Sequence, residues 1–449
     1  MTRSTDQPTQ PVHTASVAVI GAGMAGLIAA RRLRAHGVDV IVLESGSRPG
    51  GRVLAETTVL GSRVDLGGQW IGRGHHRLAS LATQLGVTVF AMRTPTVPTL
   101  IDGDVSIRNS TPSVIATAAA LLCCEAASRL GAPRAWKKHS VAACLRHVPN
   151  RRARRLLEVL ASTSSTADLD RYSMHAFLAA IRYQGGLLPM LSTAGGAQES
   201  LVVEGVGTLA ERLAAELGDR VVFDSEVTAL DRDDTGVTIH SSSGVHRAAK
   251  VIVTVAAPVA ARIEHRPPLP GERIRLQDNT YMGSVYKAIA VYDRPFWREH
   301  GHAESMVLAE PGMAVFDTSA PDGPGHLCVL VAGPEARELD RHGIEARRAA
   351  VLDPLVHHLG TEILEPRGWH EKAWHLDEHV GGGYSALPDI GADDGYFPFT
   401  STPIGHLHWA GTETAREHAG YIEGAIESGE RAAEEVWRRL TGSDADPGE

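Results

Sequence analysis

VAVIGAGMAGLIAARRLRAHGVDVIVLESGSRPGGR, residues Val17 to Arg52, is the stretch that determines the fold of this chain. It begins with an apolar run, Val17 to Ile20, which breaks into a glycine-rich turn and continues as an amphipathic helix pattern. A second apolar run, Val38 to Leu43, ends on the acid Glu44. The pattern therefore predicts a strand, a glycine turn, a helix, a second strand and an acid, in that order.

Each element of this unit has a physical role toward a dinucleotide. Gly21 allows the tight turn, Gly23 lets a pyrophosphate approach the backbone, and Gly26 lets the helix pack on the strand. The phosphates then lie at a helix N-terminus, where free N–H groups and the helix dipole favour negative charge. Glu44 accepts hydrogen bonds from a ribose. The unit predicts a Rossmann-like domain that binds a dinucleotide.

The composition excludes several classes of protein. The chain has 449 residues, 43% apolar and 22% charged, which suits a globular protein of about two domains. A net charge of −9 argues against nucleic acid as a partner, because no basic stripe offsets it. The arginines between Arg151 and Arg155 are interpreted as a solvated helix face.

No stretch of the sequence is expected to cross a membrane. The N-terminal residues MTRSTDQPTQPVHTA lack an apolar core and are interpreted as a disordered arm rather than a signal peptide. The longest apolar stretch, Val114 to Cys124, is shorter than the roughly 20 residues that a transmembrane helix needs. The four cysteines form no C-x-x-C pair and are expected to be reduced. These features favour a cytoplasmic protein.

The rest of the chain alternates between helix-rich and strand-rich stretches. From about Val87 to Gly207 the pattern is helical, and buried-strand patterns follow at 221–230, 236–242, 248–256 and 326–333. A glycine-rich strand, turn and helix then close the chain. Two distant glycine-rich sites favour one nucleotide fold of discontinuous segments with a substrate domain inserted between them.

The fold class is accordingly α/β (α+β), a Rossmann-like cofactor domain with an inserted substrate domain of mixed sheet and helices. The predicted boundaries are 14–86, 203–276 and 391–440 for the cofactor domain, 87–202 and 277–390 for the substrate domain, and 1–13 and 441–449 for disordered tails.

Over nearly its whole length the chain resembles the flavin-dependent monoamine oxidase family, in its soluble bacterial branch. Besides the stretch quoted above, the resemblance rests on DLGGQWIG (65–72), MGSVYKAIAVYDRPFW (282–297) and WAGTETAREHAGYIEGAIESGERAA (409–433). A weaker match begins at Gly195 with GGAQES. The resemblance implies FAD as the cofactor, oxidation of a C–N bond of an amine, and reoxidation by O₂ to give H₂O₂.

The resemblance also implies which residues bind FAD. Arg52 would join the glycine turn and Glu44 at the ADP half, Val227 would touch the adenine side, and Gln69 with Trp70 would lie along the flavin. The implied cofactor-binding residues are Gly21, Gly23, Met24, Ala25, Gly26, Glu44, Gly50, Gly51, Arg52, Gly68, Gln69, Trp70 and Val227, with Gly411, Glu413 and Ile422 at the ribityl and isoalloxazine end.

Lys287 is the first predicted catalytic residue. Strand alternation places it on the same face as Ile289 and Val291, where a buried lysine is costly unless its charge is paired or its pKa is depressed. The alternative is that this face is exposed at a sheet edge. The resemblance implies that this lysine binds a water at flavin N5, where hydride arrives and O₂ reacts.

Tyr384 and Tyr421 are the other predicted catalytic residues. A single tyrosine is more often packed in the core with its hydroxyl hydrogen-bonded. The resemblance implies instead that the two rings form an aromatic cage that faces the flavin and admits a neutral amine nitrogen. Activity should then rise with pH through an amine or site pKa. Gln198 is expected to line the substrate pocket with both tyrosines or to be a structural amide.

Two positions depart from the membrane-bound animal enzymes of that family. Gly383 stands where those enzymes have the cysteine that links FAD covalently, so FAD is expected to be non-covalent. His418 stands where they have a tryptophan, so the surroundings of the cage differ.

Other functions stay open at this point. An L-amino-acid oxidase shares the fold but needs a cation for the α-carboxylate, for which Arg73 and Arg182 are candidates although no segment resembles that family's arginine motif. A catalytically silent flavin-binding protein would not need Lys287 together with both tyrosines. No spacing predicts a metal site. The sequence does not distinguish monoamines, diamines, polyamines and biosynthetic intermediates as substrates, and a homodimer is the default expectation.

Overall fold

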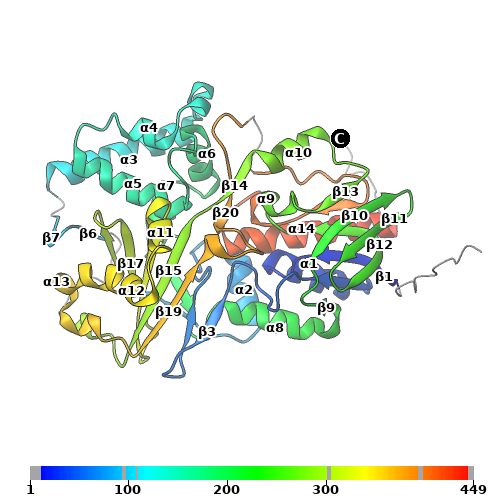
Figure 1. Cartoon of the computed structure of the whole chain (residues 1–449), viewed down its shortest axis with the longest axis horizontal. Helices are drawn as coiled ribbons and strands as arrows, with labels where there is room; N and C mark the ends of the chain where they lie inside the picture. Colours follow the sequence, from blue (N-terminus) through cyan, green and yellow to red (C-terminus); the bar gives the residue numbers. More distant parts are fainter. Residues whose placement is uncertain (1–11, 94–97, 108–109, 301–304, 393–397, 443–449) are drawn as a thin grey trace, which may run out of the picture.

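A computed structural model describes residues 12–93, 98–107, 110–300, 305–392 and 398–442. Two large sheets organise these residues, and Figure 1 shows the first at the right, the second left of centre, and a layer of helices at the upper left. The first sheet runs in the order β13 (Glu264–Arg266), β10 (Val227–Asp233), β11 (Gly236–Ser241), β12 (Gly244–Val253), β1 (His13–Ile20), β2 (Val40–Leu43) and β9 (Val221–Val222), with β21 (Leu407–Trp409) paired to β12.

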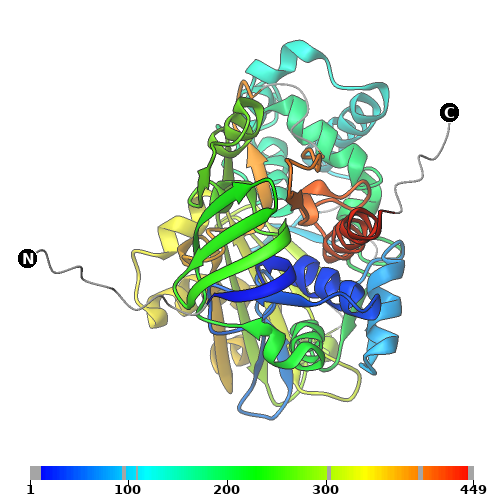
Figure 2. The same ribbon diagram turned by 90° about the vertical axis from the view of Figure 1, so that its right-hand side faces the viewer.

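Strand β1 lies in the middle of this sheet. It pairs in parallel with β2 on one side and β12 on the other. Val17 and Val19 pack with helices α1 (Met24–Ala35), α8 (Gly207–Leu217) and α14 (Ile422–Thr441), whereas Ala18 and Ile20 face a second hydrophobic cluster on the opposite side. Because both faces are covered, the strand is a continuous apolar run rather than an alternating one. Figure 2 shows α1 and α14 close together beside the sheet.

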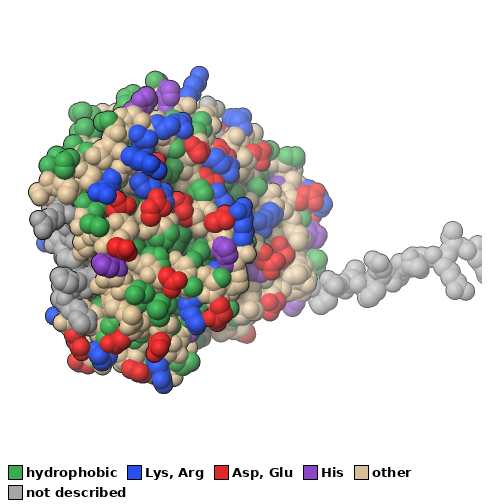
Figure 3. Space-filling model, turned by 60° about the vertical axis from the view of Figure 1, so that its left-hand side comes forward, with side chains coloured by type: hydrophobic (Ala, Val, Ile, Leu, Met, Phe, Trp, Pro, Cys, Tyr) green, Lys and Arg blue, Asp and Glu red, His purple; other side chains and the backbone are tan. Residues whose placement is uncertain are grey.

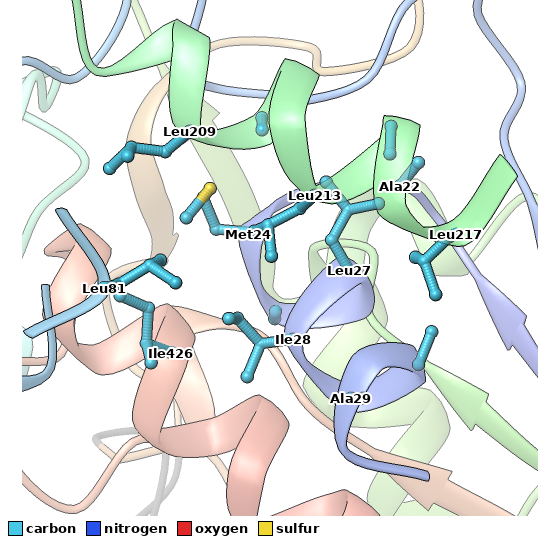
Figure 4. Close-up of a cluster of buried hydrophobic side chains, with 14 of the residues drawn as sticks. Ala22, Met24, Leu27, Ile28, Ala29, Leu81, Leu209, Leu213, Leu217 and Ile426 are labelled. Carbon is cyan, nitrogen blue, oxygen red and sulfur yellow. The ribbon is translucent and has the colours of Figure 1, made fainter. Parts of the chain in front are cut away.

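Helix α1 packs against α14 and α8, and α2 (His76–Gln84) packs against α14 within the same hydrophobic cluster. Figure 4 shows the contact, with Leu27 facing Leu213 and Leu217, and Ile28 facing Ile426. At the crossing of α1 and α14 the backbones touch, since a Cβ on Gly429 would lie 2.3 Å from the carbonyl oxygen of Ala25. The glycine at 429 therefore sets the distance between the helix of the glycine turn and the last helix.

Gly429→Ala should lower the free energy of unfolding by about 1–3 kcal/mol, because the added methyl group forces two backbones apart. Chemical denaturation of the variant measures the loss. The matched control is Gly271→Ala in the first turn of α10 (Gly271–Asp278), where the new methyl group meets only the end of the Arg275 side chain at 3.5 Å. The control should be neutral or slightly stabilising. Equal stability of both variants would contradict the close approach at 429.

The second sheet contains the strand that carries Lys287. Strand β15 (Val285–Tyr292) lies between β18 (Gly325–Ala332) and β19 (Gly368–Ala373), and all eight of its residues are buried. The sheet is therefore covered on both faces, and the alternative of an exposed edge for Lys287 is wrong. The order of this sheet is β19 (Gly368–Ala373), β15 (Val285–Tyr292), β18 (Gly325–Ala332), β17 (Met313–Asp317), β16 (Ser305–Leu308), β6 (Thr99–Asp102) and β7 (Val105–Ser106).

A layer of helices lies beside the second sheet (Figure 1). Its first helix, α3 (Pro112–Leu130), is longer than the apolar stretch 114–124. The prediction that no segment crosses a membrane rests on the length of that shorter stretch. Among the described residues this helix alone is long and apolar enough, by length and composition, to cross a membrane. The helices of the layer are α3 (Pro112–Leu130), α4 (Val141–Leu145), α5 (Arg151–Ser165), α6 (Met174–Tyr183) and α7 (Leu187–Leu191).

The remaining elements are short. The two-stranded sheets pair β3 (Ala55–Thr57) with β4 (Arg63–Asp65), β5 (Val89–Ala91) with β8 (Ser200–Val202), and β14 (Thr280–Gly283) with β20 (Gly383–Pro388). The other helices are α9 (Ala257–Ala260), α11 (Pro334–Leu339), α12 (Ile344–Leu352) and α13 (Val356–Leu359).

Several sequence expectations need correction. The strand expected at 221–230 is two strands, since Asp224 has φ +51° and separates β9 from β10. β9 is an edge strand of the sheet, and β10 lies next to the opposite edge strand, β13. The predicted tails, 1–13 and 441–449, each include one residue that belongs to a regular element. His13 begins β1, and Thr441 ends α14. Residues 1–11 and 443–449 lie outside the described residues. The proposed domain boundaries stay a prediction.

Candidate active site

The glycine turn after β1 is built from close contacts that exclude larger side chains. Gly21 has φ +101°, and a Cβ on it would lie 2.8 Å from Oγ1 of Thr254. A Cβ on Gly26 would lie 2.0 Å from the carbonyl oxygen of Gly21, so this glycine sets the contact between helix and turn. Gly23 is the N-cap of α1, and no side chain caps that helix. The free N–H groups of its first turn are therefore available to an anion.

Glu44 follows β2 at the same edge of the sheet. Its Oε2 accepts a hydrogen bond from the Ala22 amide at 2.6 Å, and its Oε1 accepts one from the Gly46 amide at 2.9 Å. A carboxylate has about four lone-pair sites, so capacity remains for the hydroxyls of a ribose. Arg48 lies nearby; burial lowers the pKa of its guanidinium, which Asp377 and Glu44 oppose.

A cavity of about 440 Å³ extends from this turn to the second sheet and the helical layer. Three of the predicted cofactor residues lie outside its lining, namely Gly26 under the turn, Val227 in the core with Leu43, and Glu413 in a buried ion pair. The predicted residues that do line it are Gly21, Gly23, Met24, Ala25, Glu44, Gly50, Gly51, Arg52, Gly68, Gln69, Trp70, Gln198, Lys287, Tyr384, Gly411, Tyr421 and Ile422.

Lys287 reaches the cavity from the interior of the second sheet and is only 3% exposed. Its Nζ donates a hydrogen bond to the carbonyl oxygen of Gly67 at 2.8 Å and another to Oε1 of Gln69. Burial lowers the pKa of the ammonium group, while the nearby Cys328 and Asp65 raise it. The side chain is thus anchored by two acceptor oxygens from the DLGGQWIG segment.

Asp65 is a residue of that segment whose role the sequence interpretation missed. Its Oδ2 and Oδ1 accept hydrogen bonds from the amides of Val206 and Gly207 at 2.8 and 3.0 Å, so it caps helix α8. Burial raises the pKa of its carboxyl to about 6, although both amides and Lys287 lower it. One feature could have pointed to this role. Helix α8 begins after Val206, whose side chain cannot cap a helix, so the cap has to come from another residue.

Arg52 and Glu413 join three separate segments around the cavity. Arg52 donates to both carboxylate oxygens of Glu413, at 2.7 and 3.3 Å, and its Nη1 also donates to the Tyr384 carbonyl oxygen at 2.6 Å. Glu413 in turn accepts from the amide of Ala386 at 3.0 Å. Burial raises the pKa of Glu413, but the charge of Arg52 and the hydrogen bonds outweigh it, so the pKa lies below its usual value. Glu413 therefore holds the backbone at Tyr384.

Tyr384 and Tyr421 both line the cavity, although they come from different elements. Tyr384 is in β20 with φ +41°, and Tyr421 is the N-cap of α14. Burial raises the pKa of each phenol, and the presence of Cys328 and Tyr421 raises that of Tyr384 further. Both hydroxyls are therefore neutral at physiological pH.

His75 lies behind Tyr421 and was not singled out from the sequence as a site residue. Its ring centroid is 5.0 Å from that of Tyr421 and 5.0 Å from that of His418, which has φ +52°. The Nδ1 atom accepts a hydrogen bond from the Gly72 amide at 2.9 Å. Burial lowers the pKa of His75 to about 4, with contributions from His418 and His76. A neutral imidazole thus supports one ring of the predicted cage.

His75→Gln should reduce the loss of stability on acidification. The folded-state pKa of His75 is about 4, below its ordinary value of 6.5, so the unfolded chain takes up the proton first and stability falls as pH drops through that window. Between pH 8 and pH 5 the loss in free energy of unfolding should be about 2 kcal/mol smaller in the variant. Chemical denaturation at the two pH values measures it. The exposed-site control His342→Gln should keep the wild-type loss, and an unchanged loss in His75→Gln would contradict the buried neutral state.

Gly383 lies against the second sheet. A Cβ at this position would lie 2.3 Å from Cγ1 of Val285 and 3.1 Å from Cγ2 of Thr166. A cysteine side chain therefore does not fit here unless the buried side chain of Val285 moves.

The sequence matches that of known proteins over most of its length. The pattern of the family described as flavin containing amine oxidoreductase matches residues 24–437. AofH of Mycobacterium tuberculosis, named as a flavin-containing monoamine oxidase, is 36% identical over 97% of this chain and 99% of its own length. The flavin-containing amine oxidase B of Bos taurus is 30% identical over 94% of this chain and 85% of its own length.

Solved structures agree with these relatives. The cyclohexylamine oxidase from Brevibacterium oxydans superposes with a TM-score of 0.89 at 28% identity, covering 95% of this chain and 99% of that one. A putrescine oxidase bound to putrescine superposes with a TM-score of 0.87 at 26% identity, covering 96% and 100%.

Proposed function

Because this chain belongs to the flavin-containing amine oxidoreductases and is an FAD-dependent amine oxidase, we propose that its substrates are apolar monoamines. The observation that carries this proposal is the polarity of the cavity wall away from the glycine turn. There the helical layer and the second sheet present apolar side chains, with a few hydroxyls and amides between them.

The residues around the glycine turn fit FAD. The uncapped N-terminus of α1 suits a pyrophosphate and Glu44 suits a ribose, while glycine backbone lines the cavity between them. When bound, FAD accepts the hydride from the carbon next to the amine nitrogen and passes the electrons to O₂, which gives H₂O₂. We propose that FAD is held non-covalently, since position 383 is a glycine without room for a thiol.

The charges on the cavity wall support a monoamine. Within the part of the chain that the structure describes, the charged lining residues are Glu44, Arg48, Arg52, Asp377 and Lys287. The first four belong to the dinucleotide end, and Lys287 is bonded to Gly67 and Gln69. Among described residues the apolar end thus has no carboxylate for a second ammonium and no arginine for an α-carboxylate. Burying either charge without a partner costs several kcal/mol.

The protein's own groups then orient the amine. We propose that the faces of Tyr384 and Tyr421 hold the nitrogen, and that Gln198 closes the pocket beside them. Since hydride leaves only a carbon beside a neutral nitrogen, the substrate must lose its ammonium proton before the reaction. Neither phenol ionises in the working range, so the rise of activity with pH should follow the amine.

Two pairs of matched amines test this proposal. Hexylamine and 1,6-diaminohexane differ by a second ammonium, and phenethylamine and L-phenylalanine differ by a carboxylate. Hexylamine and phenethylamine should each have a kcat/KM at least about 100-fold higher than the other compound of the pair. The reason is that 1,6-diaminohexane and L-phenylalanine must each bury an additional charge without a partner. The measurement is anaerobic bleaching of the bound flavin, followed by H₂O₂ release in air.

Equal rates for both members of the first pair would contradict the monoamine assignment in favour of a diamine substrate. Bleaching by L-phenylalanine alone would favour an L-amino-acid oxidase. Bound FAD that no amine or amino acid bleaches would favour a catalytically silent flavoprotein.

A further inference from the structure

Helix α3 exposes large apolar side chains to solvent, although it also packs apolar side chains on the core. Its three buried side chains are the hydroxyl residues Ser113, Thr117 and Ser128. Thr117 donates to the Ser113 carbonyl oxygen at 2.9 Å and Ser128 to the Glu125 carbonyl oxygen at 2.8 Å, so these hydroxyls are satisfied within the helix. A surface helix normally buries its apolar stripe and exposes its polar one. In α3, Val114, Leu121 and Cys124 pack inward, but a second set of apolar side chains faces outward.

The exposed stripe consists of large apolar side chains at helical spacing. Ile115, Leu122 and Leu130 are 60%, 70% and 89% exposed. The neighbouring helix α7 adds Leu188, which is 75% exposed, and the 3₁₀ helix η1 (Arg134–Lys138) adds Trp136. We call these five residues the α3 surface. Figure 3 shows apolar side chains gathered at the upper left of the molecule, beside a group of lysines and arginines. Exposed apolar patches of this kind mark interaction sites.

A basic border adjoins the α3 surface. Arg129 is on the exposed side of α3, and Arg134, Lys137 and Lys138 follow it in η1. Glu125 forms an ion pair with Arg129 and accepts a hydrogen bond from the Leu187 amide, so it offsets Arg129 and leaves the positive charge of the border to the residues of η1. In a chain of net charge −9 this is a local concentration of positive charge. An apolar stripe with a tryptophan and a basic border is typical of helices that lie in the interface of an anionic bilayer.

We propose that the α3 surface docks this enzyme on the surface of an anionic phospholipid bilayer. The helix lies flat rather than spanning the bilayer, because its inner side packs on α5, α6 and α7. A second copy of the chain is a poorer occupant. In a two-fold symmetric dimer the same surface meets itself, and the described residues of this surface and its border offer the opposing basic residues no carboxylate other than Glu125, which is already paired with Arg129. The docking stands apart from the identity of the amine and does not rest on it.

Co-sedimentation of the full-length holoenzyme with vesicles tests the docking. The protein should bind vesicles of phosphatidylcholine and phosphatidylglycerol in a 3:1 ratio, bind phosphatidylcholine alone much less, and be released by salt. The triple variant Ile115→Gln, Leu122→Gln, Leu130→Gln should lose at least 100-fold in partition coefficient. The double variant Arg134→Gln, Lys138→Gln should lose roughly fivefold per charge.

Matched variants control for general effects of surface polarity. Val105→Gln, Ile344→Gln and Leu376→Gln remove three exposed apolar side chains elsewhere and should bind within twofold of wild type. All variants should oxidise hexylamine, or whichever amine the enzyme accepts, at the wild-type rate, which shows that they fold. The proposal is wrong if wild type does not bind anionic vesicles, or if the α3 triple variant binds as wild type does. It is also wrong if sedimentation velocity shows a dimer that this variant dissolves while vesicles bind neither form.

Discussion

Lys287→Met should slow the reaction of the reduced enzyme with O₂ on the order of 10²–10³-fold, while reduction by amine changes less than about tenfold. The side chain lies on the cavity wall, held by Gly67 and Gln69, and the family resemblance puts it beside the flavin atom at which O₂ reacts. A cation fixed in a dry site stabilises developing negative charge far better than water does. Stopped-flow absorbance of flavin, first anaerobic with amine and then mixed with O₂, separates the two half-reactions.

Lys250→Met is the matched control for this prediction. Lys250 is a half-buried lysine on β12 that contacts His406 and does not line the cavity. Both half-reactions should stay within about twofold of wild type in this variant. If Lys287→Met were reoxidised at the wild-type rate, the assigned role of this lysine toward O₂ would be refuted. If only the reduction step slowed, Lys287 would act on the amine instead.

Glu413→Gln should lower the free energy of unfolding by about 3–5 kcal/mol and weaken FAD binding with it. Removing this charge leaves the guanidinium of Arg52 without its bidentate partner in a site where Glu413 itself is only 3% exposed. It also weakens the support of β20, which Glu413 provides through the Ala386 amide. Chemical denaturation of the holoenzyme measures the stability, and flavin fluorescence after dilution measures the release of FAD.

Glu434→Gln removes a comparable but exposed ion pair and serves as the control. Glu434 pairs with Arg438 at 2.9 Å along α14, with both side chains more than a third exposed. Such a pair contributes less than about 1 kcal/mol, so the control should differ little from wild type. A Glu413→Gln variant as stable as this control, with FAD still bound on dilution, would contradict the view that the Arg52–Glu413 pair holds the cavity together.

The nucleotide-binding part of the fold was predictable because its signals are local. The run from Val17 to Glu44 contains its own strands, turn and helix, and the structure has β1, α1 and β2 in that order. Gly26 meets the turn backbone as its place in the motif requires. Within such a unit, sequence neighbours are also spatial neighbours, so the pattern alone is sufficient.

Elsewhere the sequence pattern could not distinguish between structures. VVFDSEVTAL is predicted as one strand, yet Asp224 adopts a left-handed conformation, and the two halves lie on opposite sides of β1 in the sheet. Which strand each half pairs with depends on the rest of the sheet, and no local pattern contains that information. The extent of α3 was missed for another reason, because the apolar stretch ends at Cys124, before the charged Glu125, whereas the helix continues through Glu125 to Leu130.

The candidate site was predictable residue by residue but not as a network. Lys287, Tyr384 and Tyr421 were named in advance, and the structure places all three on one cavity. Their supports were not named: Asp65 beside Lys287, His75 behind Tyr421, and the use of Glu413 to hold Tyr384 through Arg52. These contacts join residues far apart in the chain, and one sequence without relatives gives no signal for such pairs.

The glycine at 383 has a consequence for the supply of flavin if FAD is held non-covalently, as proposed above. A chain without a thiol at this point has no covalent tether there, and Val285 leaves no space in which to add one. The loaded fraction of the protein is then governed by mass action, and each tenfold rise in free FAD adds about 1.4 kcal/mol to the stability of the folded state. The amount of working enzyme in a cell should therefore follow the concentration of free FAD in that cell.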